Sequence, residues 1–505
     1  MSLHRKAATE IALALQKAGY LAVFTGGCER DAVLGEMRGM HIEPKDIDIA
    51  TNATPEQIAA VFPDQNAEPV GKTFGVMIIN RHGINTDVAT FRKDGQYGDG
   101  RRPDSVELVT TNNLEEALRM DGSRRDFTFN ALYFDPATNQ RYDLFGGVDD
   151  LHAGIVRAIG DPVERFMEDR LRMLRAIRFA AKYGMTLDDS LLSALKTYSS
   201  LLHPGETTKW ERIGDELVKM LVTDNPGYAL TLLRQNGLLK EILPELVPTW
   251  GPKGAQSADW HPEGDTWTHI LMVVDANAAA KKEQGEKTSP ELGLALLLHD
   301  IAKPATQTFE TNTVDGVETV KIRNHGHAEV GAEMAREICV KLKRSSEFTN
   351  LVVAIVAAHM HMHDWGKPGT SRKVLFRLFM RPEVRELIAM QHADAMGTGL
   401  PLEERQRNSH RNFYLAKMEE MRNLPQKTQC LNAGALVTSD NLFAMGFRPG
   451  PIFSVVLRES FDAQIEGVFT DTESGVEWVR TNLERLETLI PPPKIRGKRE
   501  KKDCC

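Results

Sequence analysis

Two aspartates, Asp46 and Asp48, lie two residues apart, and the isoleucines Ile47 and Ile49 alternate with them. In an extended strand both carboxylates face one side while both isoleucines face the other side, toward a core. Two adjacent hard oxygen ligands suit Mg²⁺, which keeps several waters and binds through one or two carboxylates plus substrate phosphates. The spacing therefore predicts a magnesium site of the kind that a nucleoside triphosphate requires.

A glycine pair precedes these aspartates. Residues 21–24 are apolar and predict a buried strand that stops at Gly26 and Gly27, and residues 29–35 can start a helix. Two glycines let the backbone approach an oxyanion, the start of the helix offers free N–H groups, and Arg30 adds charge-assisted donors. The order of these features predicts a phosphate cradle next to the metal site, although either feature alone would more often be a plain turn or a solvated strand edge.

The combination resembles the head of the class II family of tRNA nucleotidyltransferases (CCA-adding enzymes) and bacterial poly(A) polymerases, in which Gly-Gly-x-apolar-Arg-Asp is followed by Asp-x-Asp. Residues 26–31 match this pattern except at Glu29, where the family usually has an apolar residue. The family's carboxylate-Val-Ala-Thr-Phe-Arg strand also matches, with Asp87 at the carboxylate position. The resemblance implies three catalytic carboxylates, Asp46, Asp48 and Asp87, the last one near the attacking 3′-hydroxyl as metal ligand or base.

Two motifs combine arginine with aspartate. On chemistry alone, Arg125 and Asp126 in an Arg-Arg-Asp-Phe-Thr motif favour an internal ion pair slightly over a nucleotide site. The resemblance reverses this preference and implies contacts to the ribose and phosphates of a nucleotide. Asp169 and Arg172 lie three residues apart, which predicts a helical ion pair worth about 0.3 kcal/mol. The resemblance implies that this pair also presents a Watson–Crick-like edge to the incoming base.

A basic stripe continues along the same predicted helix. Arg172, Arg175, Arg178 and Lys182 recur at spacings of three and four residues, beside an apolar stripe. One face of the helix is expected to pack while the neighbouring face stays basic. We therefore expect RNA contacts through Arg175 and Arg178.

A second series of chemistry-bearing residues lies further along the chain and includes a His-Asp pair that follows a predicted helix over residues 292–298. Imidazoles and carboxylates at these separations fit a hydrolytic metal centre, although each single histidine would more often be a core or surface residue. The series resembles the HD phosphohydrolase superfamily, which implies a divalent metal of unspecified identity and a phosphoesterase for cyclic or terminal phosphates of RNA ends. A degenerate HD domain kept as a scaffold is the alternative. The expected ligands are His269, His299, Asp300, His327, His359 and Asp394, with His361 and His363 as alternatives to His359.

The pattern of elements predicts an α+β fold, with a small mixed-sheet nucleotidyltransferase head followed by an all-helical neck and body, a helical HD domain and a helical C-terminal region. Residues 244–264, rich in Pro, Gly and Trp, predict a domain boundary, and residues 93–105 predict either a mobile loop beside the site or a plain surface loop. The expected domains are the head at 1–150, the neck at 151–245, the HD domain at 260–400, the C-terminal region at 401–493 and a basic, disordered tail at 494–505.

Composition excludes some classes of protein. The 505 residues are 41% hydrophobic and 26% charged, as in ordinary globular proteins of several domains. The longest apolar runs are too short to span a bilayer, and no signal-like segment opens the chain, so we expect a cytoplasmic protein with no membrane partner. Five scattered cysteines form neither a disulfide framework nor a zinc motif. A net charge of −8 argues against general coating of nucleic acid but leaves room for a local basic groove that binds RNA.

These patterns together predict a template-independent RNA nucleotidyltransferase that adds CMP and AMP to the 3′ end of tRNA, with CTP and ATP as substrates and Mg²⁺ in the head. A poly(A) polymerase is the close alternative, because the same catalytic motifs serve both reactions. An HD phosphohydrolase with a relic nucleotide-binding head, and an RNA-binding protein without enzymatic activity, are alternatives of other classes. The sequence leaves the oligomeric state open.

Overall fold

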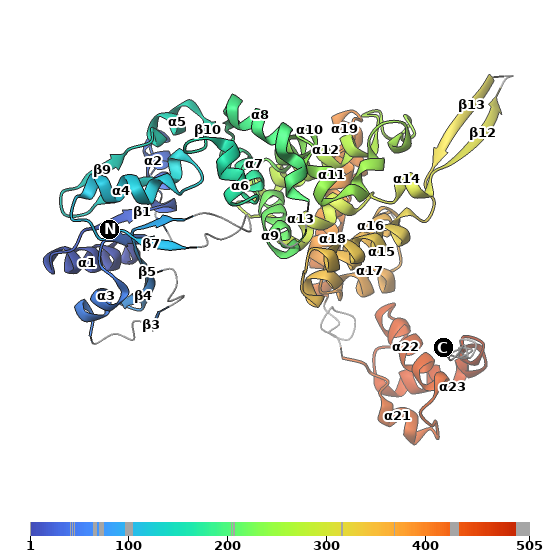
Figure 1. The fold of residues 1–505 in the computed structure, drawn as a ribbon. Coiled ribbons are helices and arrows are strands. Elements are labelled where there is room, and N and C mark those ends of the chain that lie inside the picture. Colours follow the sequence, from blue (N-terminus) through green and yellow to red (C-terminus); the bar gives the residue numbers. More distant parts are fainter. Residues whose placement is uncertain are drawn as a thin grey trace, which may run out of the picture. The chain divides into compact units, whose positions relative to one another are not determined.

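The computed structural model describes two compact units, Met1–Val356 with Gly397–Leu400, and Ala357–Met396 with Pro401–Cys505 (Figure 1). The predicted tail at 494–505 and most of the predicted loop at 93–105 lie outside the described residues. Among the residues described, no helix is both long and apolar enough to cross a membrane. The described residues are 2–40, 42, 44, 46–63, 68–69, 75–95, 105–203, 205, 208–314, 317–367, 369–424 and 434–490.

A seven-stranded sheet forms the base of the head in the first unit (Figure 1). In spatial order its strands are β3 (Glu68–Pro69), β4 (Val76–Arg81), β5 (Ile84–Thr90), β2 (Asp48–Thr51), β1 (Ala22–Thr25), β8 (Leu132–Asp135) and β9 (Gln140–Asp143). β2 and β5 run parallel, and the other neighbouring strands described in this sheet run antiparallel. The predicted mixed sheet is confirmed.

The alternation of side chains in β2 and β5 places an apolar residue on one face of the sheet and an aspartate on the other. Ile49 and Val88 are fully buried, whereas Asp48 and Asp87, one residue earlier in each strand, are exposed on the opposite face. The parallel register aligns Ile49 with Val88. The two aspartates therefore stand at the same level on neighbouring strands.

Helices cover both faces of this sheet. On one face α1 (Leu3–Lys17) and α3 (Pro55–Val61) pack around a core that contains Ile49. On the other face α4 (Leu114–Ser123) packs against a core that contains Ala50. The alternating pattern of the strand supplies a residue to each core, which fixes the register of β2. The other helices of the head are α2 (Gly27–Met37) and α5 (Gly147–Ala153).

A capping box closes the start of α3, where Thr54 precedes Pro55. Oγ1 of Thr54 accepts from the N–H of Gln57 at 3.4 Å, and the side chain of Gln57 accepts from the N–H of Thr54 at 2.8 Å. Both donors would otherwise lack a partner within the helix.

We expect Thr54→Ala to destabilise α3 by about 1 kcal/mol, because it removes one of these caps. The amide hydrogens of α3 should then exchange about fivefold faster, measured by hydrogen-exchange mass spectrometry. Thr9→Ala, within α1, removes a threonine that caps nothing and should leave exchange in α3 unchanged. Equal exchange rates in Thr54→Ala and the unsubstituted protein would show that the box does not hold the helix.

The rest of the first unit is mainly helical. The neck helices are α6 (Pro162–Glu168), α7 (Arg172–Tyr183), α8 (Asp189–Tyr198), α9 (Trp210–Leu221), α10 (Pro226–Gln235) and α11 (Leu238–Ile242). They are followed by α12 (Thr266–Glu283), α13 (Pro290–Leu298), α14 (Lys303–Thr306), α15 (His327–Lys341) and α16 (Ser346–Trp365), the last of which continues into the second unit. α9 packs against α7 on one side and against α13 on the other. Short strand pairs are β6 (Arg92–Asp94) with β7 (Val106–Leu108), β10 (Ile155–Val156) with β11 (Thr186–Leu187), and β12 (Thr308–Val314) with β13 (Val317–Arg323).

The second unit is helical in its described residues, as expected for the C-terminal region. Its last helices enclose a core that includes Leu442, Val456 and Val479. The division of the chain into five domains stays a prediction. The helices that begin in this unit are α17 (Arg372–Phe379), α18 (Val384–Met396), α19 (Leu402–Asn408), α20 (Arg411–Arg422), α21 (Ser439–Ala444), α22 (Pro451–Ile465) and α23 (Thr472–Glu487).

Candidate functional site

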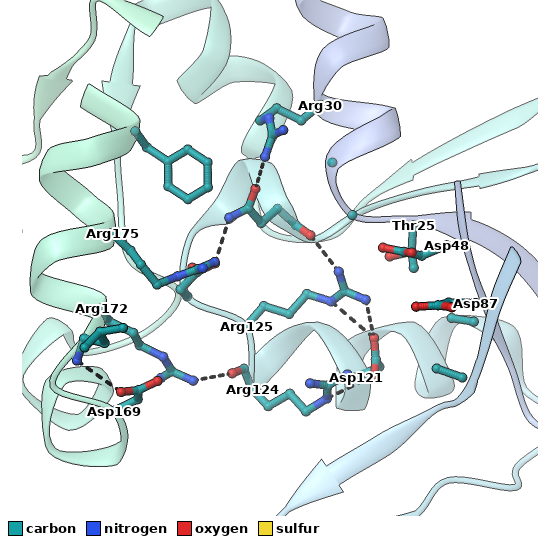
Figure 2. A pocket seen from close by; sticks show the side chains of 18 of the residues that line it. Thr25, Arg30, Asp48, Asp87, Asp121, Arg124, Arg125, Asp169, Arg172 and Arg175 are labelled. Atoms are coloured by element: carbon teal, nitrogen blue, oxygen red, sulfur yellow. Dashed lines mark hydrogen bonds and ion pairs between the residues drawn. The ribbon is translucent and has the colours of Figure 1, made fainter. Parts of the chain in front are cut away.

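A cleft of about 650 Å³ lies in the first unit, between the charged face of the head sheet and the neck helices α7 and α9 (Figure 2). Most residues that the sequence predicts for the nucleotide site line it. Asp46 and Arg178 are not among the lining residues. The predicted residues that line the cleft are Gly26, Gly27, Arg30, Asp48, Asp87, Arg125, Asp126, Asp169, Arg172 and Arg175.

The carboxylates of Asp48 and Asp87 project into this cleft side by side (Figure 2). The pKa of Asp48 is raised, first because the cleft strips part of its hydration, and then because Asp87 and Asp46 add negative charge. Arg125 opposes this shift but does not cancel it. Asp48 and Asp87 thus offer two adjacent carboxylates, and such hard oxygens are ligands that fit Mg²⁺.

Gly26 brings the backbone close to this pair of carboxylates. It caps the N-terminus of α2 with φ +82°, a conformation that a residue with a side chain rarely adopts. A Cβ at this position would lie 3.3 Å from Oδ2 of Asp48 and 3.8 Å from Nη1 of Arg125. The predicted glycine turn is therefore present, and α2 begins at Gly27, two residues before the predicted start.

Arg30 projects from the first turn of α2 and is held by the protein. Its Nε donates to Asp31 at 2.9 Å and its Nη1 donates to Asn130 at 2.8 Å. The guanidinium also lies over the rings of Phe179 and Tyr183, at 5.3 and 5.2 Å. These contacts fix a positive charge at the wall of the cleft, where the cation–π geometry holds the guanidinium plane.

Asp121, which the sequence did not reveal as a site residue, fixes two arginines of the cleft. It accepts from Nη2 of Arg124 at 2.7 Å, from Nη2 of Arg125 at 2.9 Å and from the hydroxyl of Tyr133 at 2.9 Å. Burial would raise the pKa of Asp121, but the two guanidiniums outweigh burial and hold that pKa well below its usual range. Nη1 of Arg125 donates to the carbonyl of Asn130 at 2.9 Å, so this arginine is fixed from two sides.

Asp126 is buried and forms an internal ion pair. Its carboxylate accepts from Nε of Arg175 at 2.7 Å and from the side chain of Asn130 at 2.8 Å. Burial opposes the charge of Asp126, but Arg175 and Asn130 lower its pKa below the usual value. Arg178 likewise donates to Glu216 at 2.6 Å. The ribose contact predicted for Asp126 and the RNA contacts predicted for Arg175 and Arg178 stay predictions.

The predicted ion pair between Asp169 and Arg172 is wrong. α6 ends at Glu168 and α7 begins at Arg172, so Asp169 is extended and the helical spacing does not apply. Arg172 pairs with Glu168 and donates to the carbonyl of Arg124 at 2.8 Å. Both predicted base-reading residues nevertheless line the cleft.

Arg212, a second residue that the sequence analysis missed, pairs with Asp169 across the cleft. Its Nη2 lies 2.8 Å from Oδ2 of Asp169. Arg212 comes from the start of α9, 43 residues further along the chain, so its approach depends on how α9 packs on α7. No local spacing in the sequence could have revealed this contact.

A histidine-rich cluster in the same unit corresponds to the predicted HD centre. The Nε2 atoms of His269, His299 and His327 lie 3.6, 3.2 and 3.3 Å from the carboxylate of Asp300. The carboxylate also pairs with Lys303 at 2.6 Å. Burial would raise the pKa of Asp300, but His299 and Lys303 hold it well below its usual value. Three imidazoles and one carboxylate are a donor set that fits a divalent metal.

The other ring nitrogens of these histidines are also engaged. Nδ1 of His299 lies 2.9 Å from the carbonyl of Leu296, and Nδ1 of His327 lies 2.7 Å from the carbonyl of Asn324. A carbonyl can only accept, so each Nδ1 carries a proton, and Nε2 is the ring nitrogen that faces Asp300 and would bind a metal.

The two remaining predicted ligands, His359 and Asp394, belong to the second unit. His359 is buried in α16, and Asp394 pairs with Nε2 of His363 at 2.9 Å. His361 stacks on Trp365 with a centroid distance of 5.2 Å. Metal binding by His359 and Asp394 stays a prediction.

Three family models match the chain. A poly(A) polymerase head domain matches residues 22–157, a "Probable RNA and SrmB- binding site of polymerase A" matches residues 184–248, and an HD domain matches residues 266–399. These segments correspond to the sheet with its cleft, to the neck helices and to the histidine-rich cluster.

Several proteins of known families are similar in sequence. The chain is 41% identical to a CCA-adding enzyme of Limosilactobacillus reuteri over 55% of this chain and 66% of that protein. It is 33% identical to a CCA-adding enzyme of Lactiplantibacillus plantarum over 63% of this chain and 77% of that protein. It is 38% identical to poly(A) polymerase I of Haemophilus influenzae over 46% of this chain and 50% of that protein. The matched region thus spans from half to about three quarters of these relatives.

The fold is also similar to that of a solved relative. The Bacillus stearothermophilus CCA-adding enzyme, crystallised in complex with CTP, superposes with a TM-score of 0.68 and 23% identity over 97% of this chain and all of that chain. The sequence matches and the matched models together confirm the resemblance predicted from the motifs. The chain belongs to the class II family of tRNA nucleotidyltransferases, which includes CCA-adding enzymes and bacterial poly(A) polymerases, and it carries an HD domain.

Proposed function

We propose that this protein is a template-independent RNA nucleotidyltransferase that adds CMP and AMP to the 3′ end of tRNA, completing or repairing CCA. The observation that carries the proposal is the pair of carboxylates, Asp48 and Asp87, at one level of the sheet beside the glycine turn at Gly26. A cytoplasmic location, with CTP, ATP and the tRNA 3′ end as partners, is part of this proposal.

Asp48 and Asp87 would hold Mg²⁺ together with Asp46, which is exposed just before β2. A Mg²⁺ ion held by these carboxylates would offset negative charge on the triphosphate and would lower the pKa of the attacking 3′-hydroxyl. The raised pKa of Asp48 supports this assignment, because a cation would offset both the lost hydration and the repulsion from Asp87 and Asp46 that raise it.

The protein's own groups bind and orient the substrates. The N–H groups at the start of α2, next to Gly26 and Gly27, and the fixed charge of Arg30 would receive the phosphates. Arg125 and Asp126 would contact the ribose, and Asp169 and Arg172 would read the base by hydrogen bonds. Each of these arginines already has protein partners, so it enters the reaction in a fixed position and loses little side-chain entropy on binding. Arg175 and Arg178 are the proposed RNA contacts on α7.

The test is incorporation of labelled CTP and ATP, separately and together, with Mg²⁺. Three RNAs are compared: a tRNA that ends before CCA, a tRNA that ends in CC, and an unstructured RNA. Addition that stops after the missing nucleotides, and only on tRNA, supports the proposal. No metal-dependent incorporation on any of them would contradict it and would favour an RNA-binding protein without this activity.

Poly(A) addition is the second candidate for the head. The 38% identity to poly(A) polymerase I of Haemophilus influenzae over 46% of this chain favours it. Long adenylate ladders on all three RNAs would identify this activity.

The HD cluster favours an additional metal-dependent phosphoesterase for cyclic or terminal phosphates of RNA ends, since three imidazoles converge on Asp300. Hydrolysis of a 2′,3′-cyclic phosphate is the measurement. Asp300→Asn should abolish hydrolysis and leave nucleotide addition intact. Asp48→Asn should abolish nucleotide addition and leave hydrolysis intact. Hydrolysis with no nucleotide addition by the unsubstituted protein would instead identify a phosphohydrolase with a relic head.

We expect Arg212→Gln to reduce the fidelity of base choice. Without the guanidinium, Asp169 loses the charge-assisted contact that fixes its carboxylate, which is worth about 1.5–3 kcal/mol. Incorporation of UMP or GMP relative to CMP should rise roughly tenfold in single-turnover assays. Arg119→Gln breaks an exposed arginine–glutamate pair on α4 and should leave fidelity unchanged. Unchanged fidelity in Arg212→Gln would rule out this role for Arg212.

A further inference from the structure

Glu263 lies beside the HD cluster, and its carboxylate contacts the ring of His269. Oε1 of Glu263 accepts from Nδ1 of His269 at 2.9 Å and from Nδ1 of His261 at 2.8 Å, and Oε2 accepts from the N–H of Gly399 at 2.8 Å. The side chain of Glu263 is only 2% exposed. Glu263 lies before α12, outside the residues matched by the HD model, and the sequence analysis did not select it.

The contact to Glu263 decides which nitrogen of His269 faces the cluster. The carboxylate can only accept, so it keeps the proton of His269 on Nδ1 and leaves the lone pair on Nε2, which points toward Asp300 at 3.6 Å. Nδ1 of His299 and Nδ1 of His327 contact backbone carbonyls, whereas Nδ1 of His269 contacts a side chain.

We infer that Glu263 is a positioning residue of the HD metal centre, which holds His269 as an Nε2 ligand. This inference rests on the proposed metal binding by the cluster. Outer partners of metal-binding histidines fix the ring and raise its basicity, and their loss costs about 10–100-fold in metal affinity. Glu263 is itself held by His261 and by the N–H of Gly399, so its own orientation is fixed from two further sides.

Glu263→Gln is the variant that tests this role. Glutamine keeps the shape of the side chain and can still accept from Gly399. Its amide can also donate to Nδ1 of His269, which places the proton on Nε2 and blocks the lone pair. We expect the affinity for Co²⁺ to fall about 10–100-fold, while the visible absorption band at saturating Co²⁺ keeps its position because the ligands are unchanged.

The measurement is a Co²⁺ titration of the full chain carrying Asp48→Asn, which weakens metal binding by the head. His299→Ala removes a ligand and should abolish the band. Glu283→Gln, an exposed change at the end of α12, is the matched control and should change nothing. Nucleotide addition by Glu263→Gln without the Asp48 change should remain normal and verifies folding. If glutamine prevents folding, Glu263→Asp keeps the charge, withdraws it by one methylene and should also weaken Co²⁺ binding.

The outcomes distinguish the positioning role of Glu263 from metal binding by the cluster. Unchanged Co²⁺ affinity in a folded Glu263 variant, with loss in His299→Ala, would overturn the positioning role and leave the metal centre in place. A shifted band in Glu263→Gln would make Glu263 a ligand and overturn the role as well. Equal binding by His299→Ala and the parent protein would overturn the metal centre, and the role of Glu263 with it.

Discussion

Asp48→Asn is expected to abolish nucleotide addition and yet to raise the melting temperature of the metal-free protein. The amide removes a charged metal ligand from the cleft, so incorporation of labelled CTP or ATP should fall by about three orders of magnitude or more. The same change removes a carboxylate whose charge is disfavoured by lost hydration and by the negative charges of Asp87 and Asp46. Activity is read from incorporation into tRNA lacking CCA, and stability from thermal unfolding in a chelator.

The higher melting temperature expected for Asp48→Asn follows from the raised pKa of Asp48. An acid with a higher pKa in the folded state binds its proton more tightly there, so its contribution to stability is present below the unfolded pKa of about 3.9 and is lost as pH rises through the folded pKa. At pH 7 the ionised Asp48 therefore destabilises the metal-free protein, and asparagine does not. The difference in melting temperature should shrink as the pH is lowered toward 4.

In Mg²⁺ the parent protein should have the higher melting temperature of the two. Mg²⁺ binds the folded protein with Asp48 and raises its melting temperature by mass action, but it should have little effect on Asp48→Asn. Asp149→Asn, an exposed carboxylate in the first turn of α5, is the control for the loss of one charge and should keep full activity. Incorporation by Asp48→Asn within tenfold of the parent protein would contradict the assignment of this carboxylate.

Local patterns in the sequence predict those parts of the fold that depend on neighbouring residues. Alternation assigns Asp48 to one face of a strand and Ile49 to the other, and the Thr54 cap follows from the residue types at a helix start. The mixed sheet and the helical body also follow from such periodicity and from the family resemblance. These features are encoded within a few residues of each other.

Contacts between distant segments could not be predicted in this way. Asp169 and Arg172 satisfy the spacing of a helical pair, but the chain leaves the helix between them, and Asp169 instead meets Arg212 from another helix. Asp121 and Glu263 carry no motif at all, since an acidic residue in a helix or loop is usually solvated. Their importance arises only when folding buries them against arginine or histidine side chains.

The arginine–aspartate motif at Arg125 and Asp126 predicts that ion pairs form, but it does not predict their partners. The chemistry of Arg125 and Asp126 allows an internal ion pair, and both residues do form one, but with partners other than each other: Arg125 with Asp121, and Asp126 with Arg175. The residue types predict that charge must be compensated, because burial of an unpaired ion is costly. They do not predict which partner provides the compensation, which depends on the packing of α4 and α7.

The buried carboxylate of Asp121 should therefore be the most sensitive single group for the stability of the head. Asp121→Asn leaves the guanidiniums of Arg124 and Arg125 without their counter-charge, and removing one partner of a buried ion pair costs about 3–5 kcal/mol. We expect hydrogen exchange in α4 and β8 to accelerate by at least a hundredfold at pH 7. Glu115→Gln breaks an exposed ion pair on the same helix and should cost about 0.5 kcal/mol or less.

The pH dependence and a double substitution distinguish lost charge from lost shape. The pKa of Asp121 is held well below its usual range, so its stabilisation is present above the unfolded pKa of about 3.9 and is lost as pH falls through the folded pKa. The difference between Asp121→Asn and the parent protein should stay constant from pH 7 to 5 and shrink below about pH 4. Adding Arg125→Met removes one of the two stranded cations, so the double variant should be more stable than the sum of the single losses by about 1 kcal/mol or more. Strict additivity would mean that Asp121 acts through packing alone, and the anchoring of Arg125 in the cleft would then need another cause.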